Sequence, residues 1–589
     1  MLGRLLDSSR QAFLPFLDWI TELRHRPVII ADVTAGLTVA LVLIPQSMAY
    51  AQLAGLPPYV GLYAAFLPPI ISALFGSSRQ LATGPVAIVS LMTASALQPL
   101  ASANPEGFLA YAALLALLVG IFQISLGMFR LGVLVDFLSH PVVIGFTNAA
   151  ALIIASSQMA AFFGVSVEPH PQQYMVVWHT ALAAWSGAHF PTMMFGCLAV
   201  ILILGLKYIV PPSPITPALP VLTAVIVTTV VSYLIGFEGM GGNVVGNIPN
   251  KLPAFGLPTF RFDVVVQMIA SASVIALVGF VEAISIAKSM AAESRQKIDA
   301  NQELIGQGLS NVTASLFHAY PVSGSISRSA VNFEAGAQTG FSSIITGLTV
   351  AITLLLLTPL LYHLPQATLA TIIIVAVLRL IRFKPIEHAW KVEKHDGVVA
   401  LVTFALTLLF APHIERGLLT GLLLSLVLFV YRTMRPRIVE ISMHDDGTLR
   451  DVDTHNLKTS TTVAVVRMDM SLYFANAGYL EDKILNLVAE RPVMRYLIID
   501  AQSINTVDAT GEEMLSNLSE RLKTANIDLM IARANAEVSL HLRSSGLLEH
   551  LGDYHFFRRV RDALDYIALQ LDEPHTIDCL RFSHKYLNS

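Results

Sequence analysis

Long apolar runs alternate with short polar connections from about residue 29 to residue 433. About fourteen of these runs approach the roughly 20 residues that a helix needs to cross a membrane. We therefore expect a polytopic α-helical membrane protein with 14 transmembrane segments. The predicted segments are 29–51, 58–75, 85–100, 107–129, 133–163, 191–210, 216–236, 264–287, 302–318, 327–339, 341–362, 366–381, 396–412 and 415–433.

Two of the predicted segments are interrupted. The stretches LATGPVAIVS (81–90) and PVSGSISRSA (321–330) place Gly, Pro, Ser and Thr where a membrane helix should continue. Gly and Pro weaken helices, and a freed backbone group in lipid is costly, so such breaks persist where they are buried in protein or line a cavity. Matched breaks in two halves of a chain point to a transport site. The alternative is a pair of kinks that only aid helix packing.

The two halves, 29–236 and 264–433, share one layout in which two unbroken segments precede a broken one. Seven segments per half invert the second half relative to the first, so we expect a 7+7 inverted repeat. The loop 164–190 contains no Lys or Arg, whereas the loops on the other side carry them. This bias places the N-terminus in the cytoplasm.

The regions outside the spans have their own patterns. Residues 1–28 mix Leu, Phe and Trp with charges, which predicts a cytoplasmic amphipathic segment on the membrane surface. Residues 434–460 form a connector and first strand. Strand-like and helical stretches then alternate over 461–570, which predicts a small cytoplasmic α/β domain, followed by a C-terminal tail at 571–589.

The composition agrees with a membrane protein. The chain has 589 residues, of which 54% are hydrophobic and 13% charged, against about 25% charged in soluble proteins. The net charge of −4 gives no indication of a nucleic-acid partner, and two cysteines do not suggest a disulfide framework. We find no nucleotide loop, catalytic triad or metal-ligand spacing, so we expect neither an enzyme nor a metal or other cofactor.

Three long motifs resemble those of the sulfate permease (SulP) family of anion transporters. They are IPQSMAYAQLAGLPPYVGLYAAFLPPIISALFGSSRQLATGPVAIVSLM (44–92), NQELIGQGLSNVTASLF (301–317) and PVSGSISRSAVNFEAGAQT (321–339). The tail resembles a STAS domain, which members of the family carry. The resemblance implies a mobile core beside a scaffold or gate domain, elevator-like anion transport and a homodimer in the lipid membrane. A regulatory protein at the STAS domain is a further expectation.

The resemblance places the anion between two half-helices that begin near Gly84-Pro85 and Ser327-Arg328. Helix N-termini favour anions, and each contributes about half a positive charge. Arginine within a span usually faces a transport pathway. If Arg328 faces the site, it adds a full positive charge, which suits a dianion. The alternative for Arg328 is a structural ion pair with Glu282 or Glu334.

Two more side chains, Gln46 and Tyr50, match family positions that line the pocket from the first span. Gln46 can donate to an oxyanion and Tyr50 can present a ring edge, although an interhelical hydrogen bond and simple packing explain them as well. Ser325 and Ser327 either donate hydroxyls to the anion or cap the helix. Val86 stands where some members carry an aromatic residue, which leaves the size of the pocket open.

Two acids lie in the first and eighth predicted spans. Glu282 is the acid of an otherwise apolar run, and acids within membranes often carry protons. In the family, Glu at this position is typical of proton-linked members and Asp of some sodium-linked ones. The alternative is a salt bridge from Glu282 to Arg328 that only fixes the core. Asp32, at the start of the first span, is expected at the interface.

The tail carries one regulatory candidate. VDATGEEML (507–515) corresponds to the strand-to-helix turn at which related bacterial proteins are phosphorylated, and Thr510 lies at the acceptor position. A helix N-cap is the simpler interpretation of Thr510.

The leading hypothesis is a secondary active transporter that imports sulfate with protons across the plasma (inner) membrane. Bicarbonate, chloride or dicarboxylate transport or exchange on the same scaffold is the first alternative. An anion channel or voltage-responsive motor is the second, and a nucleobase permease is the third. The PVSGSISRS motif and the STAS tail argue against the nucleobase permease.

Overall fold

The computed structural model describes residues 14–103, 107–133, 139–167, 170, 172–209, 211, 215–552, 555–571 and 579–580. Residues 1–13 of the predicted N-terminal segment and nearly all of the predicted tail 571–589 lie outside them. The chain forms two compact units, Met1–Ser425 and Leu426–Ser589. The division falls within the last apolar helix, close to the predicted boundary at 433.

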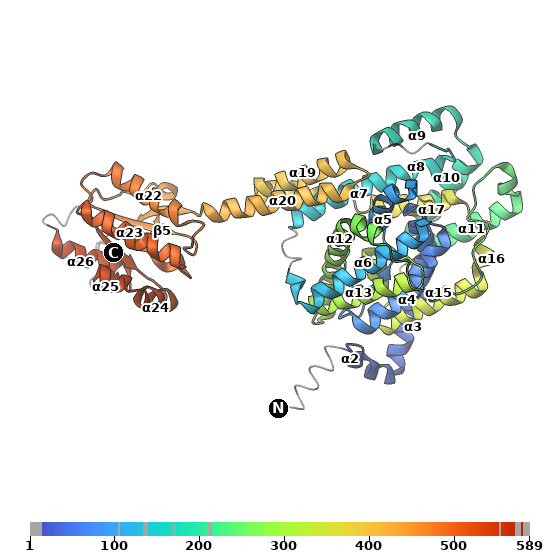
Figure 1. Ribbon diagram of the computed structural model, residues 1–589, viewed down its shortest axis with the longest axis horizontal. Helices are drawn as coiled ribbons and strands as arrows, with labels where there is room; N and C mark the ends of the chain where they lie inside the picture. Colours follow the sequence, from blue (N-terminus) through green and yellow to red (C-terminus); the bar gives the residue numbers. More distant parts are fainter. Residues whose placement is uncertain are drawn as a thin grey trace. The chain divides into compact units, whose positions relative to one another are not determined.

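Each of the fourteen predicted segments coincides with a helix in the described part of the first unit (Figure 1). Eight of its helices are long and apolar enough to cross a membrane. The helices are α3 (Arg26–Leu53), α4 (Pro58–Phe75), α5 (Ala87–Ala103), α6 (Phe108–Met128), α7 (His140–Ser157) with α8 (Met159–Phe163), α10 (Phe190–Ile209), α11 (Leu219–Ile235), α12 (Phe262–Ser294), α13 (Ala300–Leu316), α14 (Ile326–Glu334), α15 (Phe341–Ile352) with the π-helical turn η5 (Thr353–Leu357) and α16 (Thr358–Leu361), α17 (Gln366–Leu378), α19 (Lys394–Phe410) and α20 (Ile414–Met434).

Two further helices of the described residues lie in connections where the hydropathy pattern predicts none, namely α9 (Gln173–Gly187) and α18 (Lys384–Val392). The short helix α2 (Leu17–Ile20) and the 3-10 turn η1 (Thr21–Arg24) precede the first span. They are fixed to the helical unit, because Trp19 is buried and Glu22 pairs with Arg79 at 2.9 Å.

The helices form two bundles with matching contacts. The core bundle consists of α3–α6 and α12–α15, and the gate bundle of α7–α11 and α17–α19. Helix α20 joins the gate bundle, because its Gly417 and Gly421 lie against Thr407 and Thr403 of α19. In the core, α15 packs on α3 and α4, and correspondingly α6 packs on α12 and α13. In the gate, α10 packs on α17 as α19 packs on α7. Each contact between a helix of the first half and a helix of the second half thus has a counterpart with the two halves swapped, as an inverted repeat requires.

Glycines bring the core helices close together. A Cβ atom on Gly61 of α4 would lie 1.9 Å from the backbone oxygen of Ser47 in α3. In α13, a Cβ on Gly308 would lie 2.8 Å from the backbone oxygen of Gly120 in α6. Such contacts leave room for no larger residue and let the backbones touch.

The second unit is a six-stranded sheet in the order β4-β3-β5-β6-β7-β8, parallel from β5 to β8. Helices α22–α25 cover one face and α26 the other, because alternate residues of the strands enter two separate apolar cores. The strands are β3 (Ile438–Met443), β4 (Leu449–Asp451), β5 (Val463–Met468), β6 (Tyr496–Asp500), β7 (Asp528–Ala532) and β8 (Phe556–Phe557). The helices are α21 (Val452–His455), α22 (Ala477–Glu490), α23 (Ala509–Thr524), α24 (Ala536–Ser544), α25 (Leu547–Leu551) and α26 (Val560–Gln570).

Candidate functional site

The two interrupted segments meet in the core bundle. Residues Thr83–Gly84 (β1) and Ser323–Gly324 (β2) pair as a two-stranded antiparallel ribbon. The half-helices α5 and α14 begin directly after it, at Ala87 and Ile326. The sequence therefore located both breaks, and the structure brings them together across more than 230 residues of chain.

Side chains satisfy the backbone groups that the breaks release. The Ala82 amide donates to Ser329 Oγ at 2.8 Å, and the Ser325 amide donates to the Ala82 oxygen at 3.0 Å. Ser323 Oγ donates to the Gly279 oxygen of α12 at 2.7 Å. These bonds hold the ribbon rigidly at membrane depth, where water cannot replace them.

Arg328 lies in the first turn of α14 and is fully buried. Its Nη1 donates weakly to Gln46 Oε1 of α3 at 3.4 Å, while Nε and Nη2 have no hydrogen-bond partner. Within the described residues Arg328 forms no ion pair, either with Glu282 or with Glu334. An arginine with unsatisfied nitrogens within a membrane span is costly, so these two nitrogens make Arg328 a candidate contact for an anion.

The first break approaches the same guanidinium. Gly84 has φ +154°, and a Cβ atom there would lie 3.4 Å from Arg328 Nη2. Glycine therefore provides both the backbone angle and the space beside the charged group. Tyr50 and Tyr320 are buried and within electrostatic reach of Arg328, as is Glu282.

The remaining predicted residues flank the helix starts. Pro85 and Val86 are buried between β1 and α5. Ser325 caps α14, because its Oγ accepts from the Arg328 amide at 3.5 Å. Ser327 is exposed in the first turn, and its hydroxyl lies 3.4 Å from that of Ser325.

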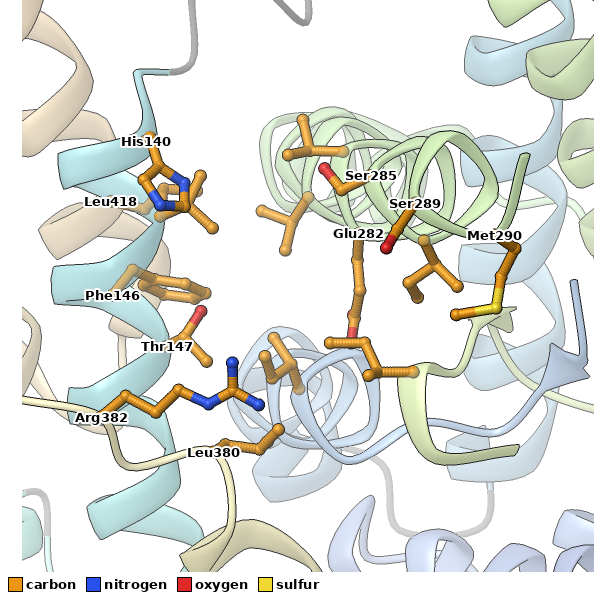
Figure 2. Close-up of a pocket in the computed structure, with 16 residues that line it drawn as sticks. His140, Phe146, Thr147, Glu282, Ser285, Ser289, Met290, Leu380, Arg382 and Leu418 are labelled. Atoms are coloured by element: carbon orange, nitrogen blue, oxygen red, sulfur yellow. The ribbon is translucent and has the colours of Figure 1, made fainter. Parts of the chain in front are cut away.

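A cavity of about 410 Å³ opens between the two bundles (Figure 2). The first turns of both half-helices line it through Ile88 and Ile326, and α12 lines it through Glu282. The Glu282 Oε2 atom is buried without a hydrogen-bond partner. The opposite wall belongs to the gate bundle and is lined by His140, Val143, Phe146, Thr147, Leu380, Arg382 and Leu418.

Several residues that fix this site carry no recognisable sequence signal. Asp32 is buried rather than interfacial, and it accepts hydrogen bonds from the amides of Gln338 and Thr339 at 2.7 and 3.1 Å. Glu303 similarly accepts from the amides of Ser77 and Ser78 at 2.9 and 3.1 Å. Both acids tie the connections beside the half-helices to neighbouring core helices.

In the sheet unit, the N-cap of α23 is Asp508, not Thr510. The Asp508 carboxylate accepts from the Gly511 amide at 2.8 Å. Thr510 is exposed in the first turn of that helix. The cap interpretation of Thr510 is therefore wrong, and phosphorylation there stays a prediction.

Comparison with known proteins decides the family. The sequence profile of the Sulfate permease family matches residues 29–403, and that of the STAS domain matches residues 454–563. The chain belongs to the sulfate permease family. It is therefore an anion transporter with a STAS domain, not an enzyme.

Relatives extend over almost the whole chain. Sulfate transporter 4.1, chloroplastic, of Arabidopsis thaliana is 36% identical and the match covers 99% of this chain and 86% of the relative. High affinity sulfate transporter 2 of Stylosanthes hamata is 31% identical, with 94% and 86% covered. The structure of the murine Slc26a9 anion transporter in the inward-facing state matches with a TM-score of 0.86 at 23% identity, covering 95% of each chain. This last likeness confirms the predicted fold class, whereas the number of membrane crossings stays a prediction.

Proposed function

We propose that this protein is a secondary active transporter that carries sulfate together with protons across the plasma membrane. The observation that carries the proposal is the buried Arg328, whose Nε and Nη2 have no partner beside two half-helix starts. The names of its relatives as sulfate transporters support the choice of sulfate among anions.

In this proposal the anion lies between the two half-helices. Each helix start offers about +0.5 charge, and Arg328 raises the total to about +2, which balances a dianion. Gln46 turns its amide and Tyr50 its ring toward the anion, and Ser325 and Ser327 offer hydroxyls. Gly84, Pro85 and Val86 form the opposite wall with their backbone.

Glu282 is the proposed proton carrier. It lines the cavity, one carboxylate oxygen is buried without a partner, and no ion pair fixes it to Arg328. A carboxyl group that is free of a structural bond can take up and release its proton as the cavity opens and closes.

Movement of the core bundle against the gate bundle would alternate access. The cavity lies between the two bundles, and Ser95 of α5 also donates across them to Glu415 Oε2 of α20 at 3.3 Å. An elevator-like motion would break this contact and close the cavity. A homodimer and a regulatory partner of the STAS domain complete the proposal.

Sulfate uptake into proteoliposomes, with and without an inward proton gradient, tests the function. We expect uptake that the gradient drives above equilibrium and that chloride, bicarbonate or dicarboxylates do not abolish. The absence of sulfate uptake under any gradient would refute the proposal, and competition by bicarbonate would favour the alternative substrate.

The variant Glu282→Gln tests the coupling. We expect sulfate exchange to persist while proton-driven accumulation disappears, because the amide cannot carry a proton. Glu334→Gln is the matched control, since Glu334 is an exposed acid at the end of α14. Normal accumulation by Glu282→Gln would show that another group couples protons.

A further inference from the structure

The gate wall of the cavity carries a cation that the anion site between the half-helices does not use. Of the 16 residues that line the cavity, Glu282 is the one acid and Arg382 the one arginine. Figure 2 shows Arg382 and Thr147 on one side of the opening, across from Glu282 and Ser285. Arg382 is exposed, and its guanidinium has no hydrogen bond or ion pair within the described residues.

The backbone at Arg382 is held in place from α7. Asn148 Oδ1 accepts from the Arg382 amide at 2.6 Å, and Asn148 Nδ2 donates to the Arg382 oxygen at 3.1 Å. Asn148 is 1% exposed and also donates to the Ile144 oxygen of its own helix. The buried Asn148 side chain both accepts from and donates to the backbone of Arg382. These two hydrogen bonds fix the Arg382 backbone at the cavity wall, and with it the point from which the side chain extends.

We propose that Arg382 is a second anion contact, on the gate bundle, that favours dianions over monoanions at the mouth of the cavity. The proposal rests on the proposed anion transport and deepens it, since it names the charge class of the substrate. When Glu282 is ionised, its charge offsets part of the positive potential of the half-helices and Arg328. Arg382 restores that potential on the side from which the anion enters or leaves.

The charge of the ligand gives the proposal a quantitative signature. A cation acts on an anion in proportion to the charge of the anion, so the fold-change for a dianion is the square of that for a monoanion. If removal of the cation weakens the binding of a monoanion about five-fold, it weakens the binding of a dianion about twenty-five-fold. A hydrogen bond without long-range attraction would weaken both about equally.

Binding of sulfate, oxalate and chloride to the purified full-length protein tests this in vesicles of phosphatidylcholine alone. We expect Arg382→Gln to lose affinity about twenty-five-fold for the dianions and about five-fold for chloride, and Arg382→Lys to retain most of it. Arg379→Gln is the matched control, because Arg379 follows the last residue of α17 in the same connection as Arg382, is exposed and does not line the cavity.

Four outcomes would overturn the proposal, and a fifth would overturn only the choice of sulfate as the substrate. Arg382→Gln could match Arg379→Gln, or it could weaken dianions and chloride equally. The loss could also appear only when anionic lipid is added, which would make Arg382 a contact for lipid headgroups. Should the wild-type protein bind oxalate but not sulfate, the proposed substrate fails while the ratio of oxalate to chloride still decides the role of Arg382. Absence of binding by any anion would overturn both.

Discussion

Arg328→Gln separates a ligand-binding charge from a structural one. A structural arginine is expected to be paired, so its removal should destabilise the protein even without ligand. Arg328 instead is fully buried with Nε and Nη2 unpartnered, and within the described part of the chain its one side-chain hydrogen bond, to Gln46, is long at 3.4 Å. Its removal should therefore leave the stability of the anion-free protein unchanged or raise it.

The loss should appear in the stabilisation by sulfate. Losing a buried charge partner costs about 2.7 kcal/mol, or about 100-fold in the dissociation constant. At a sulfate concentration about 100 times the wild-type constant, ligand binding stabilises the wild type by about 2.7 kcal/mol. The same sulfate concentration is about equal to the dissociation constant of the variant, so binding should stabilise the variant by only about 0.4 kcal/mol.

Thermal unfolding in detergent, with sulfate or gluconate at equal ionic strength, measures both quantities. Arg379→Gln controls for the general loss of a positive charge at an exposed site. The reasoning is refuted if Arg328→Gln keeps the full sulfate-dependent rise in Tm. It is also refuted if the variant is strongly destabilised in gluconate, because the side chain would then hold the fold itself.

Two further predictions concern packing and access. Gly61→Ala should lower stability by about 1–3 kcal/mol, because its Cβ would lie 1.9 Å from the Ser47 oxygen, whereas Gly205→Ala, with open space around it, should raise stability by up to about 1 kcal/mol. Thermal unfolding of the two variants checks this, and equal effects would contradict it. Ser95→Ala should remove the bond to Glu415 across the bundles and shift the two access states about five-fold, for a hydrogen bond of about 1 kcal/mol. Distances between spin labels on the two bundles would reveal the shift, and unchanged distance populations would argue against a role in access.

The sequence predicts the parts of this fold that depend on local composition. Membrane helices can be predicted from hydropathy. Gly and Pro within an apolar run predict a helix break, whose backbone groups must then form hydrogen bonds elsewhere in the protein. Both interrupted stretches and Arg328 can therefore be identified from the sequence. The closely spaced Gly306 and Gly308 in GQGLSN likewise indicate a helix that packs closely against its neighbours.

Long-range partners could not be predicted in this way. Asp32 lies in an ordinary run of the first span, and only the fold brings it beneath the amides of Gln338 and Thr339. In the sequence Arg382 is an ordinary basic residue of a loop. Only the fold places its backbone against Asn148 and its side chain at the cavity. Thr510 and Asp508 are both good cap residues, and the exact start of the helix decides between them.

The two breaks pair with each other in one ribbon but differ in charge, and this asymmetry bears on the substrate. TGPVAI at 83–88 aligns with SGSISR at 323–328, so Ile88 is the counterpart of Arg328 in the other half. Two equivalent helix starts supply about +1 in total. Had both halves carried arginine, the site would hold about +3 and bind a dianion too tightly to release it. With isoleucine at one place and arginine at the other, the proposed site would carry a charge of about +2 and balance a dianion. Ile88→Arg should therefore trap sulfate and slow its turnover.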